Sequence, residues 1–124
     1  MAVRIEDSIL ESVKKLTNSE GDNYFDTDLV IHINTVFSIL AQMGVGPEEG
    51  FSIDDKSTTW DEFTDDEPLF NMVKTYMAIR VKLFYDIASA NSYYITQLQQ
   101  EADELEWRIR AQAELVRIGE AEDA

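Results

Sequence analysis

The chain has 124 residues, enough for one domain with one modest core, and its 44% hydrophobic content excludes a disordered acidic tail. It carries 25 Asp and Glu against 10 Lys and Arg, and the net charge of −15 argues against holding nucleic acid through phosphate contacts. The absence of cysteine excludes disulfides, thiolate catalysis and sulfur-ligated zinc, and we expect no membrane span or secretion signal because no apolar stretch is long enough.

The N-terminal region predicts a short helix followed by a turn. Residues 5–16 carry one apolar stripe, and Ser8 with Glu11 resembles a capping box in which each side chain satisfies the other's backbone donor. Residues 17–24 are rich in Asn, Asp and Gly, which favour turns.

A second helix is predicted over residues 26–43, with Asp26 or Thr27 as its N-cap and Gly44 at its end. The side chains expected to face the core recur at helical spacing: Leu29, Ile33, Val36, Phe37, Leu40 and Met43. His32, the single histidine, lies at the margin of this face, without a serine or a second histidine at ligand spacing. We interpret it as a structural histidine.

The connection over residues 45–67 is long, irregular and acidic, which is uncommon inside a compact domain and is often functional. Alternation near residues 51–53 allows a short strand or β-hairpin, and residues 58–63 predict a helical turn. The apolar residues expected to pin this loop to the bundle are Phe51, Ile53, Trp60 and Phe63.

The central helix is predicted over residues 68–86, because Pro68 suits a first helical position and no glycine or further proline follows. Apolar residues cover about two-thirds of its circumference, more than the roughly one half that a surface helix of a small monomer needs. This excess indicates burial on several sides or contact with a second chain. Arg80 falls near the middle of the apolar arc, so its guanidinium either snorkels to solvent or pairs with a carboxylate in the core or across a subunit interface.

A long fourth helix is predicted over residues 93–118, after a turn over residues 87–92 and with Asn91 or Ser92 as its cap. Its seam resembles that of a coiled coil, interrupted by Gln112, and comprises Ile95, Leu98, Ala102, Leu105, Ile109 and Val116. Residues 119–124 begin with glycine and are mostly polar, which predicts a flexible tail.

Together these elements predict a single all-α domain over residues 1–124. It is a small bundle of about four helices with one long acidic loop and a long C-terminal helix. The sequence contains no arrangement of side chains that predicts an active site, a metal site or a cofactor site. We therefore expect that the protein is not an enzyme.

Segments along nearly the whole chain occur in a characteristic order: DTDL at 26–29, HINTVF at 32–37, MGVGP at 43–47, GFSI at 50–53, WDEF at 60–63, VKTY at 73–76, VKLFYD at 81–86 and LEWR at 105–108. In this order they resemble the head-tail connector (adaptor) proteins of long-tailed bacteriophages and related prophages. Relatives often have prolines after the aspartate that ends the third helix, whereas this chain has Ile87, Ala88 and Ser89 there.

The resemblance implies a structural virion protein of the head-tail interface, made in the cytoplasm of the host bacterium. It implies a dodecameric ring beneath the portal protein, where the ring extends the DNA channel and DNA passes without specific binding. The implied partners are the portal, neighbouring copies in the ring and the downstream head-completion or tail-terminator protein. No membrane, cofactor or enzyme activity is implied, and the acidic surface suits a channel through which DNA slides.

A second interpretation of the charge is an acidic DNA mimic that inhibits a host DNA-binding protein, and a third is a plainly solvated surface. The residues expected at an interface with the portal or with a neighbouring copy are Arg80, Trp107, Leu115, Val116 and Ile118. The last three form an apolar patch beyond the regular part of the seam. We expect this patch and the tail to become ordered on docking to the portal.

Overall fold

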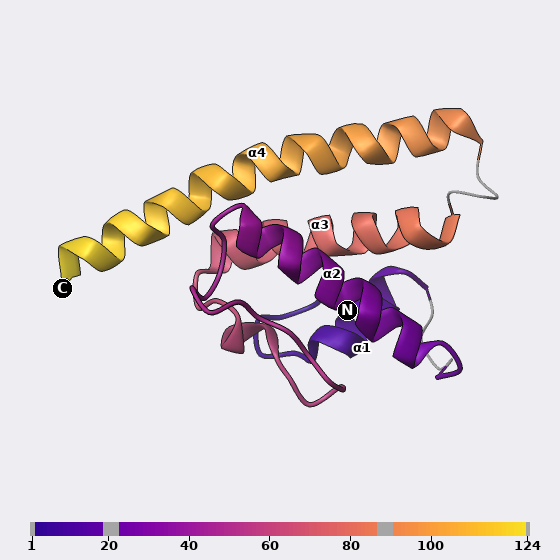
Figure 1. The fold of residues 1–124 in the computed structure, drawn as a ribbon, viewed down its shortest axis with the longest axis horizontal. Coiled ribbons are helices and arrows are strands. Elements are labelled where there is room, and N and C mark those ends of the chain that lie inside the picture. The colour runs from indigo at the N-terminus through magenta and orange to yellow at the C-terminus, as the bar shows by residue number, and fades with distance from the viewer. Residues whose placement is uncertain (1, 19–22, 87–90, 124) are drawn as a thin grey trace.

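The protein is an all-α bundle built around α3, as the sequence predicts (Figure 1). The computed structural model describes residues 2–18, 23–86 and 91–123, and no strand forms in these ranges. The elements are α1 (Ile9–Leu16), α2 (Asp26–Gln42), the 3₁₀ turn η1 (Trp60–Glu62), α3 (Glu67–Asp86) and α4 (Ser92–Asp123). Helices α1, α2 and α4 all pack on α3, and α4 runs antiparallel to α3 on the side away from α1. The turn predicted after α3 falls mostly outside the described residues.

Helix α1 begins at Ile9, later than predicted, because the residues before it pair with the segment around η1. Backbone hydrogen bonds of 2.8–3.2 Å join residues 5–9 to residues 58–61 and include one antiparallel bridge. The pairing holds the backbone out of the helical conformation, as the extended ψ of 133° at Ser8 shows. Half of the predicted capping box is confirmed: Ser8 Oγ accepts a hydrogen bond from the amide of Glu11 at 3.2 Å, but the described residues show no return bond from the Ser8 amide to the Glu11 carboxylate.

Helix α2 begins at Asp26 as predicted, but neither Asp26 nor Thr27 caps it. Phe25 occupies the N-cap position and provides no side-chain hydrogen bond. The Asp26 carboxylate instead lies 3.0 Å from the ammonium of Lys14 on α1, which is almost fully buried and also donates to Asn23 Oδ1 at 2.6 Å. Because a buried cation needs a counter-ion, Asp26 joins two helices and is not available to cap one.

The segment between α2 and α3 is part of the core. Ile53, Trp60 and Phe63 are buried, and the ring of Phe37 on α2 packs against Phe51 and Phe63 at centroid distances of 4.9 and 5.0 Å. The prediction that these residues pin the loop to the bundle is confirmed, and so is the helical turn, which is η1. The β-hairpin that the alternation allowed does not form among the described residues.

Asn34 in α2 and Gly44 just after this helix direct the path of the segment. The Asn34 amide donates to the carbonyl of Ile53 at 2.9 Å, and its oxygen accepts from the Ile53 amide at 2.8 Å. This pair satisfies the backbone of Ile53 without a neighbouring strand. Gly44 adopts a φ of +80° and ends α2 as predicted.

Helix α4 begins at Ser92 and is capped by Asn91, whose Oδ1 accepts a hydrogen bond from the amide of Tyr94 at 2.8 Å. The predicted end of this helix at residue 118 is wrong, because the helix continues through Gly119 to Asp123. A glycine inside a helix costs only about 1 kcal/mol relative to alanine, and the Glu and Ala residues that follow favour helix. The flexibility of this end in the free protein stays a prediction.

A partly buried hydrogen bond joins α3 to α4. Tyr76 is fully buried, and its hydroxyl donates to Glu106 Oε2 at 2.9 Å. Burial, followed by this hydrogen bond, raises the pKa of Tyr76 above the usual tyrosine value. Above pH of about 10 an unfolded tyrosine therefore binds fewer protons than folded Tyr76, so the free energy of unfolding falls as the pH rises.

We expect the free energy of unfolding of Tyr76→Phe to fall less steeply with pH than that of the wild type. The difference should emerge above pH of about 10, because the variant lacks the phenol whose ionisation the folded state resists. Urea denaturation across this alkaline range measures the slope, and Tyr93→Phe, at an exposed tyrosine of α4, is the matched control. Equal slopes for Tyr76→Phe and the wild type would contradict the argument.

Candidate assembly surfaces

The outward side of α4 carries exposed apolar side chains towards its C-terminal end. Trp107, Leu115 and Ile118 are 72%, 61% and 47% exposed, and we call these three residues the outer stripe. At about 100° per residue they lie on the side of the helix opposite its buried face. That buried face comprises Leu98, Ala102, Ile109 and Ala113. The stripe is thus apolar surface that the fold itself does not use.

Val116, which the sequence groups with this patch, points to a different place. It is partly buried and lines a hollow of about 480 Å³ between the end of α4 and the segment that follows α2. One residue along a helix turns the side chain by about 100°, so Val116 cannot share a face with its neighbour Leu115. The structure therefore brings Leu115, Ile118 and Trp107 together and leaves Val116 beneath them.

Two polar links hold the C-terminal half of α4 against the bundle. Gln112 Nε2 donates at 3.0 Å to Asp66 Oδ2, the same oxygen that caps α3 by accepting from the amide of Leu69 at 2.9 Å. Arg117 Nη2 donates at 2.7 Å to the carbonyl of Gly44. Gln112, the polar residue that interrupts the predicted seam, thus contacts the start of α3. A polar residue in an otherwise apolar seam was the signal in the sequence for such a contact.

Arg80 lies partly buried on α3, beside the contact with α4. Its charge favours ionisation of Tyr76, against the opposite influence of Glu106 and Asp103. Within the described part of the chain its guanidinium makes no ion pair and no hydrogen bond. The described residues therefore do not include the predicted carboxylate partner of Arg80, and an ion pair across a subunit interface stays a prediction.

We expect Arg80→Leu to leave the melting temperature of the free protein nearly unchanged and to weaken self-assembly about tenfold. The reason is that a neighbour's carboxylate would lose its charged partner at a desolvated contact. Light scattering after size-exclusion chromatography measures assembly, and Lys82→Leu on the same helix is the control. Normal assembly of Arg80→Leu would show that Arg80 only snorkels to solvent.

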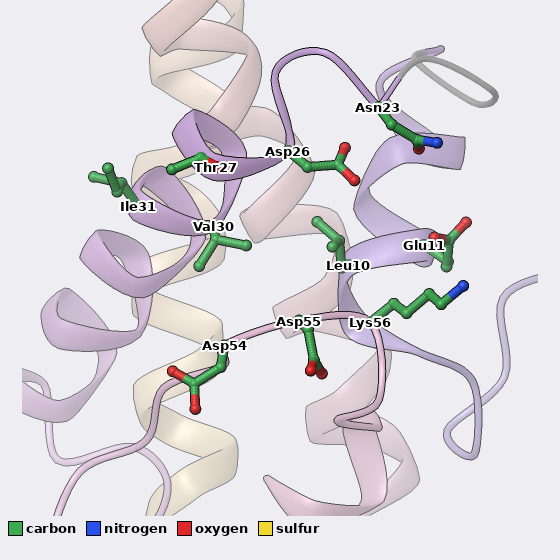
Figure 2. Close-up of a pocket in the computed structure, with 10 residues that line it drawn as sticks. All are labelled: Leu10, Glu11, Asn23, Asp26, Thr27, Val30, Ile31, Asp54, Asp55 and Lys56. Atoms are coloured by element: carbon green, nitrogen blue, oxygen red, sulfur yellow. The ribbon is translucent and has the colours of Figure 1, made fainter.

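A groove on another face was not expected from the sequence (Figure 2). It lies between α1, the first turns of α2 and residues 54–56, and its volume is about 490 Å³. Its apolar wall comprises Leu10, Val30 and Ile31, and its carboxylates are those of Glu11, Asp26, Asp54 and Asp55, with Lys56 as the single cation. We call it the acidic groove. Three segments that are distant in the sequence build it, so no local pattern could have predicted it.

The charge of the groove is fixed in part by local hydrogen bonds. Ser57 donates to Asp55 Oδ1 through its hydroxyl and through its amide, the latter at 2.8 Å. These two bonds lower the pKa of the Asp55 carboxyl. The carboxylate therefore remains ionised well below neutral pH, and the groove keeps its negative rim.

The single histidine lies among aromatic side chains. His32 stacks on Phe84 with ring centroids 4.4 Å apart and meets the edge of Tyr85 at 5.1 Å, as expected for a structural histidine. In residues 2–18, 23–86 and 91–123 no three His, Cys, Asp or Glu side chains are placed to hold a metal ion. None of the described helices combines the length and apolarity needed to cross a membrane.

Comparison with known proteins gives one finding. Neither a search of curated proteins nor one of solved structures finds a match. A scan against protein families matches residues 9–116 to the family described as phage connector protein. The match begins at the first residue of α1 and extends far into α4, so it includes every helix of the bundle. The chain therefore belongs to the phage connector protein family, and its role is that of a structural connector of the virion.

Proposed function

We propose that this connector is the subunit of a dodecameric ring beneath the portal, which extends the DNA channel and offers a platform to the next head-completion or tail protein. In this role the last turns of α4 contact the portal. DNA passes through the ring without specific binding, because a net charge of −15 repels its phosphates.

The outer stripe is the observation that carries the proposal. Exposed apolar side chains gathered on one side of a helix are a recurrent sign of a protein contact, and tryptophan is enriched where such contacts contribute most energy. Leu115 and Ile118 lie in the last turns of α4 and are exposed, while Arg117 between them holds these turns to the carbonyl of Gly44. Exposed apolar side chains on a helix end that is held in place suit contact with a partner.

We expect the double variant Leu115→Ser with Ile118→Ser to fold normally and to lose at least about tenfold in affinity for purified portal rings. Burying one such side chain contributes about 1.5–3 kcal/mol, and both are exposed in the free protein. Circular dichroism checks the fold, and co-sedimentation with portal rings measures binding.

Tyr93→Ser, which removes an exposed aromatic side chain at the other end of α4, is the matched control. Substitution is a cleaner test than truncation after Arg110, because truncation would also remove the Gln112 and Arg117 links to the bundle. Unchanged portal binding by the double variant would assign docking to the loop over residues 46–67 instead.

The same preparations distinguish a connector from an acidic DNA mimic, the alternative that the net charge supports. A connector binds the portal and shows no measurable affinity for duplex DNA at physiological salt. A mimic ignores the portal, remains a monomer or dimer, and binds a basic host protein. Salt-sensitive micromolar binding to duplex DNA would contradict both functions.

A further inference from the structure

We propose that neighbouring copies meet head to tail, with Trp107 of one copy seated in the acidic groove of the next. The proposal rests on the ring assembly proposed above and names the two faces that would form it. It assigns the middle of α4 to the neighbouring copy and leaves the last turns, with Leu115 and Ile118, to the portal.

The first argument is the exposure of Trp107. Its side chain is the largest of the apolar side chains on the outward side of α4 and is 72% exposed. It lies eight residues before Leu115, about 12 Å along the helix axis at 1.5 Å per residue. Trp107 is thus far enough from the helix end to contact a different partner from the one that covers Leu115.

The second argument is the shape of the acidic groove. Its volume of about 490 Å³ and its wall of Leu10, Val30 and Ile31 provide an open apolar surface, and Ile31 is itself 57% exposed. Figure 2 shows Leu10 and Val30 between α1 and α2, Ile31 farther out on α2, and the carboxylates of Asp54 and Asp55 on the segment that passes beside them. A tryptophan buries about 150–250 Å² in such a contact, enough to act as its anchor.

The third argument is the position of the two surfaces. Helices α1 and α4 pack on α3 from opposite sides (Figure 1), so the acidic groove and the outward side of α4 face away from each other. Two different and complementary surfaces on opposite sides of a subunit give a heterologous contact, which leaves one free surface at each end of a chain of copies. Such a contact closes into a ring when its rotation is suitable.

The fourth argument is charge. Copies that each carry a net charge of −15 repel one another, so a stable contact must bring a cation of one copy to the acidic rim of the next. Arg108 and Arg110 follow Trp107 in the sequence, one and three residues later. Arg108 is paired with Glu104 at 2.9 Å, whereas Arg110 makes no ion pair or hydrogen bond in the described part of the chain. Arg110 is therefore available to the carboxylates of the groove.

The decisive experiment is cross-linking between introduced cysteines, which the absence of native cysteine makes unambiguous. Ala111 is exposed one turn after Trp107, and Thr27 lines the groove. We expect Ala111→Cys with Thr27→Cys in one chain to give a ladder of dimers, trimers and larger species with a short bis-maleimide. A mixture of the two single variants should stop at dimers, and each single variant alone should remain uncross-linked.

The experiment is run on the free protein and on the protein bound to purified portal rings. A double variant at exposed positions outside both surfaces, Ser38→Cys with Thr75→Cys, controls for random collisions. No ladder in either preparation, or a ladder no stronger than the control, overturns the head-to-tail pairing. Dimers from Ala111→Cys alone would also overturn it, because they would mean that α4 meets α4.

A second measurement uses the tryptophan itself. We expect Trp107→Ala to weaken self-association at least tenfold in sedimentation velocity. Its melting temperature should equal that of the control variant Gln100→Ala, which changes an exposed polar residue on the same side of α4. Unchanged self-association of Trp107→Ala overturns the proposal. Portal binding without any ladder of cross-linked species would reject the head-to-tail pairing but keep the proposed function. A ladder without portal binding would support the pairing and reject the proposed function.

Discussion

Gly46→Ala is expected to lower the free energy of unfolding by about 3 kcal/mol. Gly46 has a φ of +94°, a conformation that costs a residue with a Cβ atom about 1–2 kcal/mol. The added Cβ would lie 2.5 Å from Cε1 of Phe63. That ring cannot retreat easily, because it is buried against Phe37 and Phe51 at centroid distances of 5.0 and 5.3 Å, and overpacking a core typically costs about 1–3 kcal/mol.

Gly50→Ala provides the matched control for this prediction. Gly50 has nearly the same backbone conformation, with a φ of +89°, but no atom lies within 4 Å of the position of its added Cβ. It should therefore lose only the conformational part, about 1–2 kcal/mol. Urea denaturation measures both values. Equal losses for the two variants would mean that Phe63 moves aside freely, so that the segment after α2 is not packed as tightly as the structure shows.

Asp26→Ala is expected to lower the free energy of unfolding by about 2 kcal/mol. It leaves the ammonium of Lys14, whose side chain is only 2% exposed, without the carboxylate 3.0 Å away. Removing one member of a fully buried pair typically costs about 3–5 kcal/mol, but Asp26 itself is about one-third exposed and Asn23 still accepts from Lys14, so we expect a smaller loss. Thermal and urea unfolding measure the change.

Asp28→Ala is the control, because it also removes a carboxylate from the first turn of α2 but not the partner of Lys14. Its free energy of unfolding should fall by no more than about 0.3–1 kcal/mol, the contribution of a charge at a helix N-terminus. The combined variant Lys14→Met with Asp26→Ala should recover part of the loss, since an apolar side chain of similar length needs no counter-ion. A combined variant less stable than Asp26→Ala would argue against the loss of the Lys14–Asp26 ion pair as the cause.

Much of the fold followed from local patterns in the sequence. The helical periodicities predicted all four helices, and Gly44 and Asn91 marked two of their ends correctly. Starts and ends that depend on distant residues were missed. Helix α1 starts late because its first predicted turn pairs with residues 58–61, and no local signal at the N-terminus reports that pairing.

The candidate surfaces were predictable only in part. The excess of apolar residues towards the end of α4 correctly indicated exposed side chains such as Leu115 and Ile118. The prediction also included Val116 because it is adjacent in the sequence, but the turn of the helix places its side chain on the inner side. The acidic groove could not be predicted, because its walls come from separate segments and acidic residues are abundant throughout the chain. Asn34, which holds Ile53, was visible only as one of several polar residues on α2.

The pairing of residues 5–9 with residues 58–61 also bears on the order in which the chain folds. Helices α3 and α4 are neighbours in the sequence and can form a helical hairpin through short-range contacts, which form fast. The N-terminal pairing joins segments about fifty residues apart, so it requires a long loop to close and cannot begin until residue 61 has left the ribosome. Residues 5–9 are synthesised long before residues 58–61, so this segment must wait for its partner and reaches its native conformation well after it has been made.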